Sequence, residues 1–180
     1  MRTILALALV LSWSAAEAAP LEIHVSESRD DSSITEAETT IAVDADAAYQ
    51  RVTDYALWST IFPDIHQVLV TQRQGVDARV TLVHAAGNRD NVHFRNRPAA
   101  RTVWFEDTGG RAEVWAEITF APGTRPGTSV VRSRIYADVH GVASLFVSDS
   151  KLRHLRQERI RNDLTQLRAY FDRELITAAR

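Results

Sequence analysis

Apolar and polar positions follow two different periods along the chain, and each period predicts one kind of element. Residues 34–43 alternate between β-branched and polar side chains, which is typical of a strand. Asp44 or Asp46 then offers a helix cap, and residues 47–55 place apolar side chains at helical spacing. The apolar and aromatic residues 57–62 follow. This pattern predicts one strand followed by two short helical segments.

Pro63 ends the helical stretch, and beyond it the period becomes that of strands. Turn-forming pairs such as Gln74-Gly75 and Gly109-Gly110 separate the apolar runs. Short strands joined by tight turns predict an antiparallel meander. We expect six strands in this part, at residues 65–74, 78–85, 91–97, 102–107, 112–121 and 129–139.

The last predicted element is a long helix over residues 149–178, which contain no Pro or Gly. At 1.5 Å per residue such a helix spans roughly 45 Å, long enough to lie diagonally across a curved sheet. The elements together predict an α+β domain in which about seven antiparallel strands wrap around the C-terminal helix. The helix should pack through an apolar stripe made of Leu152, Leu155, Ile160, Leu164, Leu167, Phe171 and Leu175.

The beginning of the chain resembles a signal peptide. Arg2 precedes an apolar run at residues 4–11, and Ala16-Glu17-Ala18 has the A-x-A form that signal peptidase cleaves. The run is shorter than the roughly 20 apolar residues of a membrane-spanning helix. We therefore expect a signal peptide over residues 1–18 and export, to a bacterial periplasm. A leader or edge segment over residues 19–33 and one domain over residues 34–180 should follow.

Composition excludes some classes of function. The chain has no cysteine, so it has neither disulfides nor thiolate chemistry, and its net charge of −2 gives no electrostatic case for nucleic acid. Acidic residues dominate between Glu27 and Asp46, whereas the last thirty residues are rich in arginine. We expect these two surfaces to attract each other across the fold. The alternative is a basic helix that contacts anionic lipid headgroups or docks on an envelope partner.

Residues 41–49 and 52–65 carry a motif of a known superfamily. The motif is a strand ending in Val-x-Ala, a helix ending in Asp-Tyr, an aromatic residue and a Phe-Leu-Pro-like turn, and Ile61-Phe62-Pro63 stands in that turn here. In this motif and in its order of elements the chain resembles the START-like, or SRPBCC, superfamily of helix-grip proteins, of the polyketide cyclase or coenzyme-Q-binding type. The resemblance implies an apolar cavity between the sheet and the helix, which binds a lipid, quinone, sterol or polyketide.

The resemblance also suggests which side chains contact the ligand. Our leading interpretation is a carrier that binds its ligand without catalysis and without a cofactor, and residues 141–148 are expected to form a mobile gate at the edge of the cavity. Three aromatic residues after the first helix should cover one mouth of the sheet. The expected ligand-binding residues are Val52, Tyr55, Trp58, Phe62, Leu82, Phe94, Val114, Ile118, Ile135, Leu164, Leu167 and Phe171.

A cyclase or dehydratase is the alternative function, and a cavity histidine would be its general base. The candidates are His66, which follows the Pro63 turn, and His84, which ends an apolar strand. His84, Asp90 and His93 form the only close cluster of possible metal ligands, but they lack a compact ligand spacing, so we expect no metal site.

The last predicted strand carries alternating polar residues, Arg132, Arg134, Tyr136 and Asp138. If this face points inward, one of the arginines is positioned to bind a ligand's carboxylate or phosphate. We favour the outward orientation, with pairing to Glu113 and Glu117 of the preceding strand, because the opposite face is more apolar.

Overall fold

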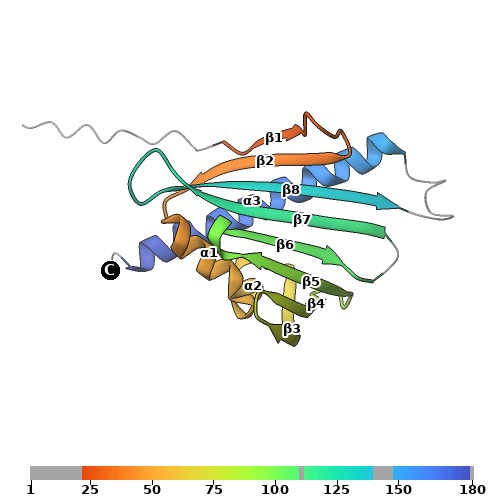
Figure 1. The fold of residues 1–180 in the computed structure, drawn as a ribbon, viewed down its shortest axis with the longest axis horizontal. Coiled ribbons are helices and arrows are strands. Elements are labelled where there is room, and N and C mark those ends of the chain that lie inside the picture. Colours follow the sequence, from red (N-terminus) through yellow and green to blue (C-terminus); the bar gives the residue numbers. More distant parts are fainter. Residues whose placement is uncertain (1–21, 110–111, 140–147, 179–180) are drawn as a thin grey trace, which may run out of the picture.

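The computed structural model describes residues 22–109, 112–139 and 148–178. One antiparallel sheet of eight strands has the order β1-β2-β8-β7-β6-β5-β4-β3, and the long helix α3 crosses behind it (Figure 1). The α+β helix-grip architecture expected from the sequence is confirmed. The strands are β1 (His24–Glu27), β2 (Ile34–Ile41), β3 (Ile65–Gln74), β4 (Asp77–His84), β5 (Arg89–Arg97), β6 (Thr102–Asp107), β7 (Ala112–Pro122) and β8 (Ser129–Val139).

The predicted signal peptide lies outside the described residues. The same is true of the predicted gate, apart from Ser148, the last of its residues.

Two short helices connect β2 to β3. Helix α1 (Ala45–Thr53) begins after Asp44, whose side chain accepts a hydrogen bond from the amide of Asp46, so Asp44 is the cap. A 3₁₀ turn, η1 (Tyr55–Leu57), leads into α2 (Trp58–Ile61). The chain then turns at Pro63 into β3, as the sequence predicted. A second 3₁₀ turn, η2 (Pro98–Ala100), joins β5 to β6.

The sheet is a meander from β3 to β8, and β2 returns antiparallel beside β8. The turn between β3 and β4 requires a positive φ, and Gly75 supplies it with a φ of 59°. Strand β1 pairs with β2 at the edge of the sheet. This is the eighth strand, within the segment that the sequence indicated as a leader or edge segment.

The core lies between the inner face of the sheet and the helices. Helices α1, α2 and α3 (Asp149–Ala178) contribute to one cluster of buried residues with the inward-facing side chains of β2 and β4–β8. Strand β3 is different, because Ile65 is its one buried residue and most of the strand is exposed. The side chains Leu69 and Val70 therefore remain 38% and 49% exposed.

The apolar stripe of α3 differs at its ends from the predicted one. Leu155 and Leu175 are 48% and 41% exposed, so they do not belong to it. Arg156 and Tyr170 are buried in their place, at 6% and 3% exposure. The spacing of apolar residues could not show this, because the crossing of α3 over the sheet decides which positions are covered.

Candidate ligand site between the sheet and the long helix

The predicted ligand-binding residues converge on the layer between the sheet and α3. Eleven of the twelve belong to the buried core cluster, and Val114 is half-buried. Their side chains come from α1, η1, α2 and the residue that follows it, β4, β5, β7, β8 and α3, segments that are spread along the sequence. Tertiary structure thus brings them together, and their contact with a ligand stays a prediction.

Aromatic rings fill one end of this layer. The ring of Trp58 lies 5.1 Å from that of Phe62, 4.9 Å from that of Phe94 and 5.8 Å from that of Phe105, between ring centroids. The indole Nε1 of Trp58 donates a hydrogen bond of 2.8 Å to the carbonyl of Val52. The ring of Tyr55 lies 6.2 Å from that of Trp58. The three aromatic residues expected after the first helix, Tyr55, Trp58 and Phe62, therefore pack together, and Trp58 anchors them to α1.

Tyr55 and Asn96 form a polar pair inside the apolar layer. The hydroxyl of Tyr55 donates to Oδ1 of Asn96 at 3.2 Å and accepts from Nδ2 at 2.9 Å. Both residues are buried, and burial raises the pKa of the Tyr55 hydroxyl. Because each group satisfies the other, the pair is stable without a ligand.

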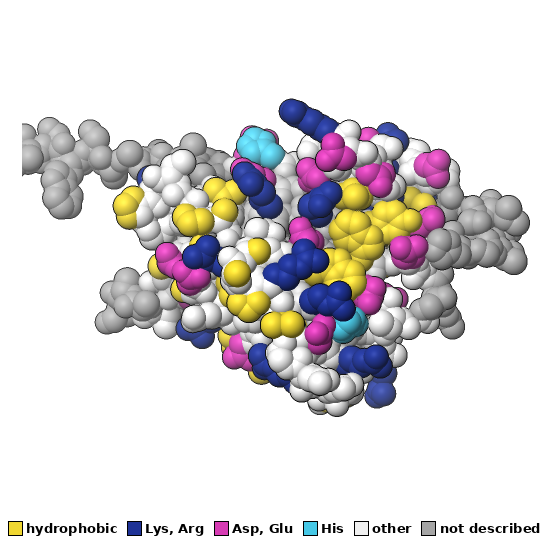
Figure 2. Space-filling view, in the orientation of Figure 1, with side chains coloured by type: hydrophobic (Ala, Val, Ile, Leu, Met, Phe, Trp, Pro, Cys, Tyr) yellow, Lys and Arg dark blue, Asp and Glu magenta, His cyan; other side chains and the backbone are white. Residues whose placement is uncertain are grey.

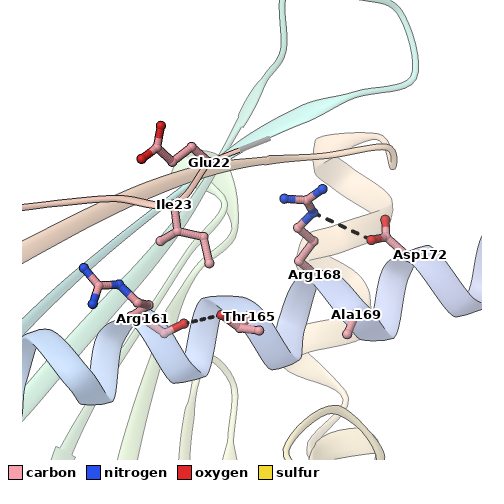
Figure 3. A pocket seen from close by; sticks show the side chains of 7 residues that line it. All are labelled: Glu22, Ile23, Arg161, Thr165, Arg168, Ala169 and Asp172. Carbon is pink, nitrogen blue, oxygen red and sulfur yellow. Dashed lines mark hydrogen bonds and ion pairs between the residues drawn. The ribbon is translucent and has the colours of Figure 1, made fainter. Parts of the chain in front are cut away.

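Three surface depressions of the described structure are lined by residues other than the twelve. The largest, of about 610 Å³, is an open groove between the segment before β1 and the exposed side of α3. Figure 3 shows the side chain of Ile23 pointing across it toward Arg161 and Thr165 of α3, whereas the side chain of Glu22 points away from the helix. Five of its seven lining residues are polar or charged and it is open to solvent, so it does not provide an apolar cavity.

The second depression, of about 230 Å³, lies on the outer face of the sheet around His93 and Asp77. His93 contacts the carboxylates of Asp77 and Glu106 at 3.2 Å each, on the outer face. This face interleaves basic and acidic side chains around an apolar patch (Figure 2). Trp115 and Tyr136, half-buried, stack on this face.

The arginines of β8 point outward, as favoured from the sequence, but their partners differ. Arg132 and Arg134 pair with Glu38 and Glu36 of β2, at 2.7 and 3.1 Å. The expected partner Glu117 instead lies 3.5 Å from Arg97. The sequence could not reveal the pairing of β2 with β8, because these strands are almost one hundred residues apart.

The third depression, of about 300 Å³, lies where the beginning of α3 meets the ends of β2 and β8. Arg156 lines it, a residue that the sequence indicates only as one of the arginines of a basic helix. The structure buries this guanidinium against the inner side of the sheet. The sequence contains a signal for this burial. Arg156 lies four residues before Ile160 and eight before Leu164, and this spacing places all three on one face of the helix.

The structure separates the two histidine candidates. His66 is exposed, and it occupies a register shift between Ile65 and Gln67 on the edge strand. His84 shares the inward face of β4 with Leu82 and is 18% exposed. Its Nε2 donates to the carboxylate of Asp90 at 2.7 Å, and its Nδ1 lies 3.8 Å from Asp64.

An ion-paired cluster on α3 continues from His84. Arg159 contacts Asp64 at 3.4 Å and Asp163 at 3.0 Å. Burial raises the pKa of Asp163 to about 6, although Arg159 opposes this rise. One carboxylate oxygen each of Asp64 and Asp163 is buried without a hydrogen-bond partner. The cluster can therefore hold or exchange a proton near pH 6.

The charges of α3 are largely engaged within the fold. Arg153 pairs with Glu27 of β1 at 2.7 Å, which is one instance of the expected attraction between the acidic segment and the basic helix. Other acids of that segment pair elsewhere, for example Asp46 with Arg101. In the described ranges, no helix is long and apolar enough to span a bilayer. Those ranges also contain no group of three or more His, Asp or Glu side chains arranged for a metal ion.

Comparison with solved structures shows the same fold in other proteins. The START superfamily protein from Mycobacterium smegmatis has a TM-score of 0.64 and 12% identity, over 78% of this chain and 97% of that chain. The Zhui aromatase/cyclase from Streptomyces sp. R1128 has a TM-score of 0.61 and 17% identity, over 78% of this chain and 92% of that one.

The di-domain ARO/CYC BexL from the BE-7585A biosynthetic pathway has a TM-score of 0.64 and 20% identity, over 77% of this chain. The match covers 46% of BexL, so the chain spans about half the length of that protein. Comparison with curated protein sequences finds no match. Residues 33–172 match the family described as polyketide cyclase / dehydrase and lipid transport. Since this match runs from the residue before β2 far into α3, the protein belongs to that family, within the START-like helix-grip superfamily.

Proposed function

We propose that the protein binds a hydrophobic small molecule between the sheet and α3 and carries it without chemical change, outside the cytoplasm. The observation that carries this proposal is the convergence of apolar side chains from eight elements on one layer beneath α3. Membership in a family described as polyketide cyclase / dehydrase and lipid transport supports it. A lipid, quinone, sterol or polyketide suits such an apolar wall.

Binding requires the layer to open. In the described structure, side chains such as Phe94, Phe171 and Leu167 are 0–2% exposed and fill the space beneath α3. A ligand that enters must displace some of these side chains. The more tightly the ligand binds the open arrangement, the more it favours that arrangement over the closed one. We expect the opening on the β3 side of the sheet, because α3 does not cover most of β3.

Native mass spectrometry of the mature protein, purified from the periplasm of cells that produce it, tests this function. We expect a bound species at a stoichiometry of about one, and solvent extraction should release a hydrophobic compound. Protein that carries nothing, and that binds no member of a panel of fatty acids, sterols and quinones, would refute the proposal. Cell fractionation of the full chain and of a variant without residues 2–18 tests export, because only the full chain should reach the periplasm.

A cyclase or dehydratase activity is the second candidate, and the position of His84 favours it. When Nε2 carries the proton that it donates to Asp90, Nδ1 carries none and can act as a base, with the carboxylate of Asp64 3.8 Å away. With the extracted compound as substrate, we expect His84→Gln to lower the turnover rate at least about a hundredfold while the ligand affinity changes little. The matched variant His66→Gln should keep the full rate. A compound that remains unchanged after long incubation with the wild-type protein would exclude this activity and leave carriage.

A further inference from the structure

A buried guanidinium lies at the end of the ligand layer. Arg156 of α3 is 6% exposed and faces the beginning of β2 and the end of β8. Its Nε donates to Oγ1 of Thr35 at 3.3 Å, its Nη1 to the carbonyl of Ala137 at 3.2 Å, and its Nη2 to the carbonyl of Ser32 at 3.4 Å. All three acceptors are neutral, and all three bonds exceed the usual length of about 2.9 Å.

In the part of the chain that the structure describes, Arg156 forms no close ion pair: its hydrogen bonds go to neutral oxygens, and the carboxylate of Asp31 interacts with it only at longer range. Hydrogen bonds from Ser33 are the main cause that lowers the pKa of Asp31, and Arg156 contributes least to it. The sequence of residues 140–147 contains no acidic residue. A buried charge without a partner costs several kcal/mol, so this site favours an incoming anion.

Arg156 also opens onto a space of suitable size. It lines the depression of about 300 Å³, whose walls include the apolar side chains of Leu152 and Ala137. The next inward-facing residues along these two elements, Ile135 on β8 and Ile160 on α3, belong to the core. A molecule seated here touches the guanidinium, and its chain reaches the ligand layer by displacing core side chains such as these two.

Three other charged groups line the same depression, Arg153, Asp138 and Asp149. The guanidinium of Arg153 is engaged by Glu27 at 2.7 Å. Asp149 is exposed, so water screens its charge, and Asp138 is half-buried near Tyr136, at the outward-facing positions of β8. The buried Arg156 is screened much less, and its planar fork can bind two oxygens of one anion at once.

We propose that this depression binds the carboxylate or phosphate head group of an amphipathic ligand through Arg156, while the apolar chain of that ligand enters the layer beneath α3. The inference rests on the proposed function, because it names the polar end of the same ligand. It thereby narrows the ligand class from any hydrophobic compound to one with an anionic end.

Affinity measurements with three ligands of equal chain length test the head-group site. Hexadecanoic acid, hexadecyl phosphate and 1-hexadecanol are titrated into delipidated mature protein by isothermal calorimetry. We expect at least one of the two anions to bind about tenfold more tightly than the alcohol, and the tighter anion identifies the natural head group.

Variants then assign this preference to one side chain. Arg156→Gln should abolish the preference for the anion and leave the affinity for the alcohol within about twofold, while Arg156→Lys should retain part of it. The matched control Arg132→Gln removes the same charge from the outer face, where Arg132 is 65% exposed, and should change nothing.

Two results would overturn the head-group site. One is equal affinity of the wild-type protein for the acid, the phosphate and the alcohol. This comparison uses the wild-type protein alone, so it remains possible even if Arg156→Gln fails to fold. The other is an Arg156→Gln variant that weakens all three ligands equally. In both results the alcohol still binds the wild-type protein, so the proposed function survives. If no ligand of any kind binds the wild-type protein, the proposed function and the head-group site fail together.

Discussion

Polar side chains inside the apolar layer differ in how fully they are satisfied. Tyr55 and Asn96 exchange two hydrogen bonds and form a closed pair. Arg156 has neutral acceptors only, and Asp163 keeps one buried oxygen without a partner. A satisfied pair stabilises the fold, whereas an incompletely satisfied group adds sensitivity to pH or to a ligand. At the scale of residues, the pair of Tyr55 and Asn96 thus stabilises the fold, whereas Arg156 and Asp163 are the groups that can respond to a ligand or to pH.

The closed pair allows a prediction on stability. Tyr55→Phe removes the hydroxyl and leaves the buried amide of Asn96 without this partner, so the free energy of unfolding should fall by about 1–3 kcal/mol. Urea denaturation measures the loss. Tyr136→Phe serves as the control, because Tyr136 lies on the outer face, and its change should stay below about 0.5 kcal/mol. Equal losses in the two variants would contradict the role of the buried pair.

The raised pKa of Asp163 predicts a pH dependence of stability. Its pKa is about 6 in the folded protein, against 3.8 ordinarily, so folding favours the protonated acid. This contribution is complete below about pH 4 and is lost as the pH rises through 6. Asp163→Asn mimics the neutral acid, so at pH 8 it should be more stable than the wild type by roughly 2–3 kcal/mol, and about equal to it at pH 4.

Unfolding free energies measured at several pH values check this difference. The control is Asp172→Asn, on the same helix and also paired with an arginine four residues away, but 51% exposed. Its difference from the wild type should not vary between pH 4 and pH 8 by more than about 0.5 kcal/mol. A wild type and an Asp163→Asn variant with parallel pH profiles would show that Asp163 titrates normally.

At the scale of elements, α3 and β3 represent opposite extremes of burial. Four side chains of α3 pack in the core: Ile160, Leu164, Leu167 and Phe171. Strand β3 pairs only with β4 and leaves both of its faces mostly exposed. Register shifts near Ile65 and Val70 further interrupt its ladder, which is a common protection of an edge strand. The free side of the layer therefore lies toward β3 and β4.

Two leucines of α3 give a matched test of how this helix packs. Leu164 is 1% exposed and Leu155 is 48% exposed, although the sequence places both on one apolar stripe. Leu164→Ala should lower the free energy of unfolding by about 2–5 kcal/mol, because it leaves a cavity in the core. Leu155→Ala should cost less than about 1 kcal/mol. Similar losses would mean that α3 is rotated about its axis relative to this structure.

At the scale of the whole molecule, the sheet and α3 form a grip whose interior is the candidate site. The hydrogen-bonded pairing of β2 with β8 places a strand from the beginning of the chain beside the last strand, and α3 returns across the sheet to β1 and β2. The ion pair Glu27–Arg153 joins α3 to β1, and the hydrogen bond from Arg156 to Thr35 joins α3 to β2. A ligand between the layers adds contacts to both, so it should stabilise the whole domain.

Removal of the ligand tests this coupling. Delipidated protein should unfold at a lower temperature than protein with its natural ligand, because a ligand at one hundred times its Kd stabilises the folded state by about 2.7 kcal/mol. Differential scanning calorimetry before and after solvent extraction measures the shift, and adding the extract back should restore the original Tm. A Tm that extraction leaves unchanged would indicate that the released compound was not bound between the layers.

The sequence by itself determined the elements and their order, because hydrophobic periods of two and of three to four residues are local properties. It predicted the strands from β2 to β8, a helix cap at Asp44 or Asp46 and the turn at Pro63, and its short motif led to the family. It left β1 undecided, because residues 24–27 lack strong apolar anchors and become a strand only by pairing with β2.

Tertiary structure alone decided which polar groups meet. The partners of Arg132 and Arg134, the cluster of His84 with Asp64 and the burial of Arg156 each join residues at least twenty positions apart. They depend on the pairing of β2 with β8 and on the angle at which α3 crosses the sheet. The hydrophobic periodicity of a single segment gives no information on either of these. The apolar wall was therefore predictable from the sequence, whereas the charged groups at its edges were not.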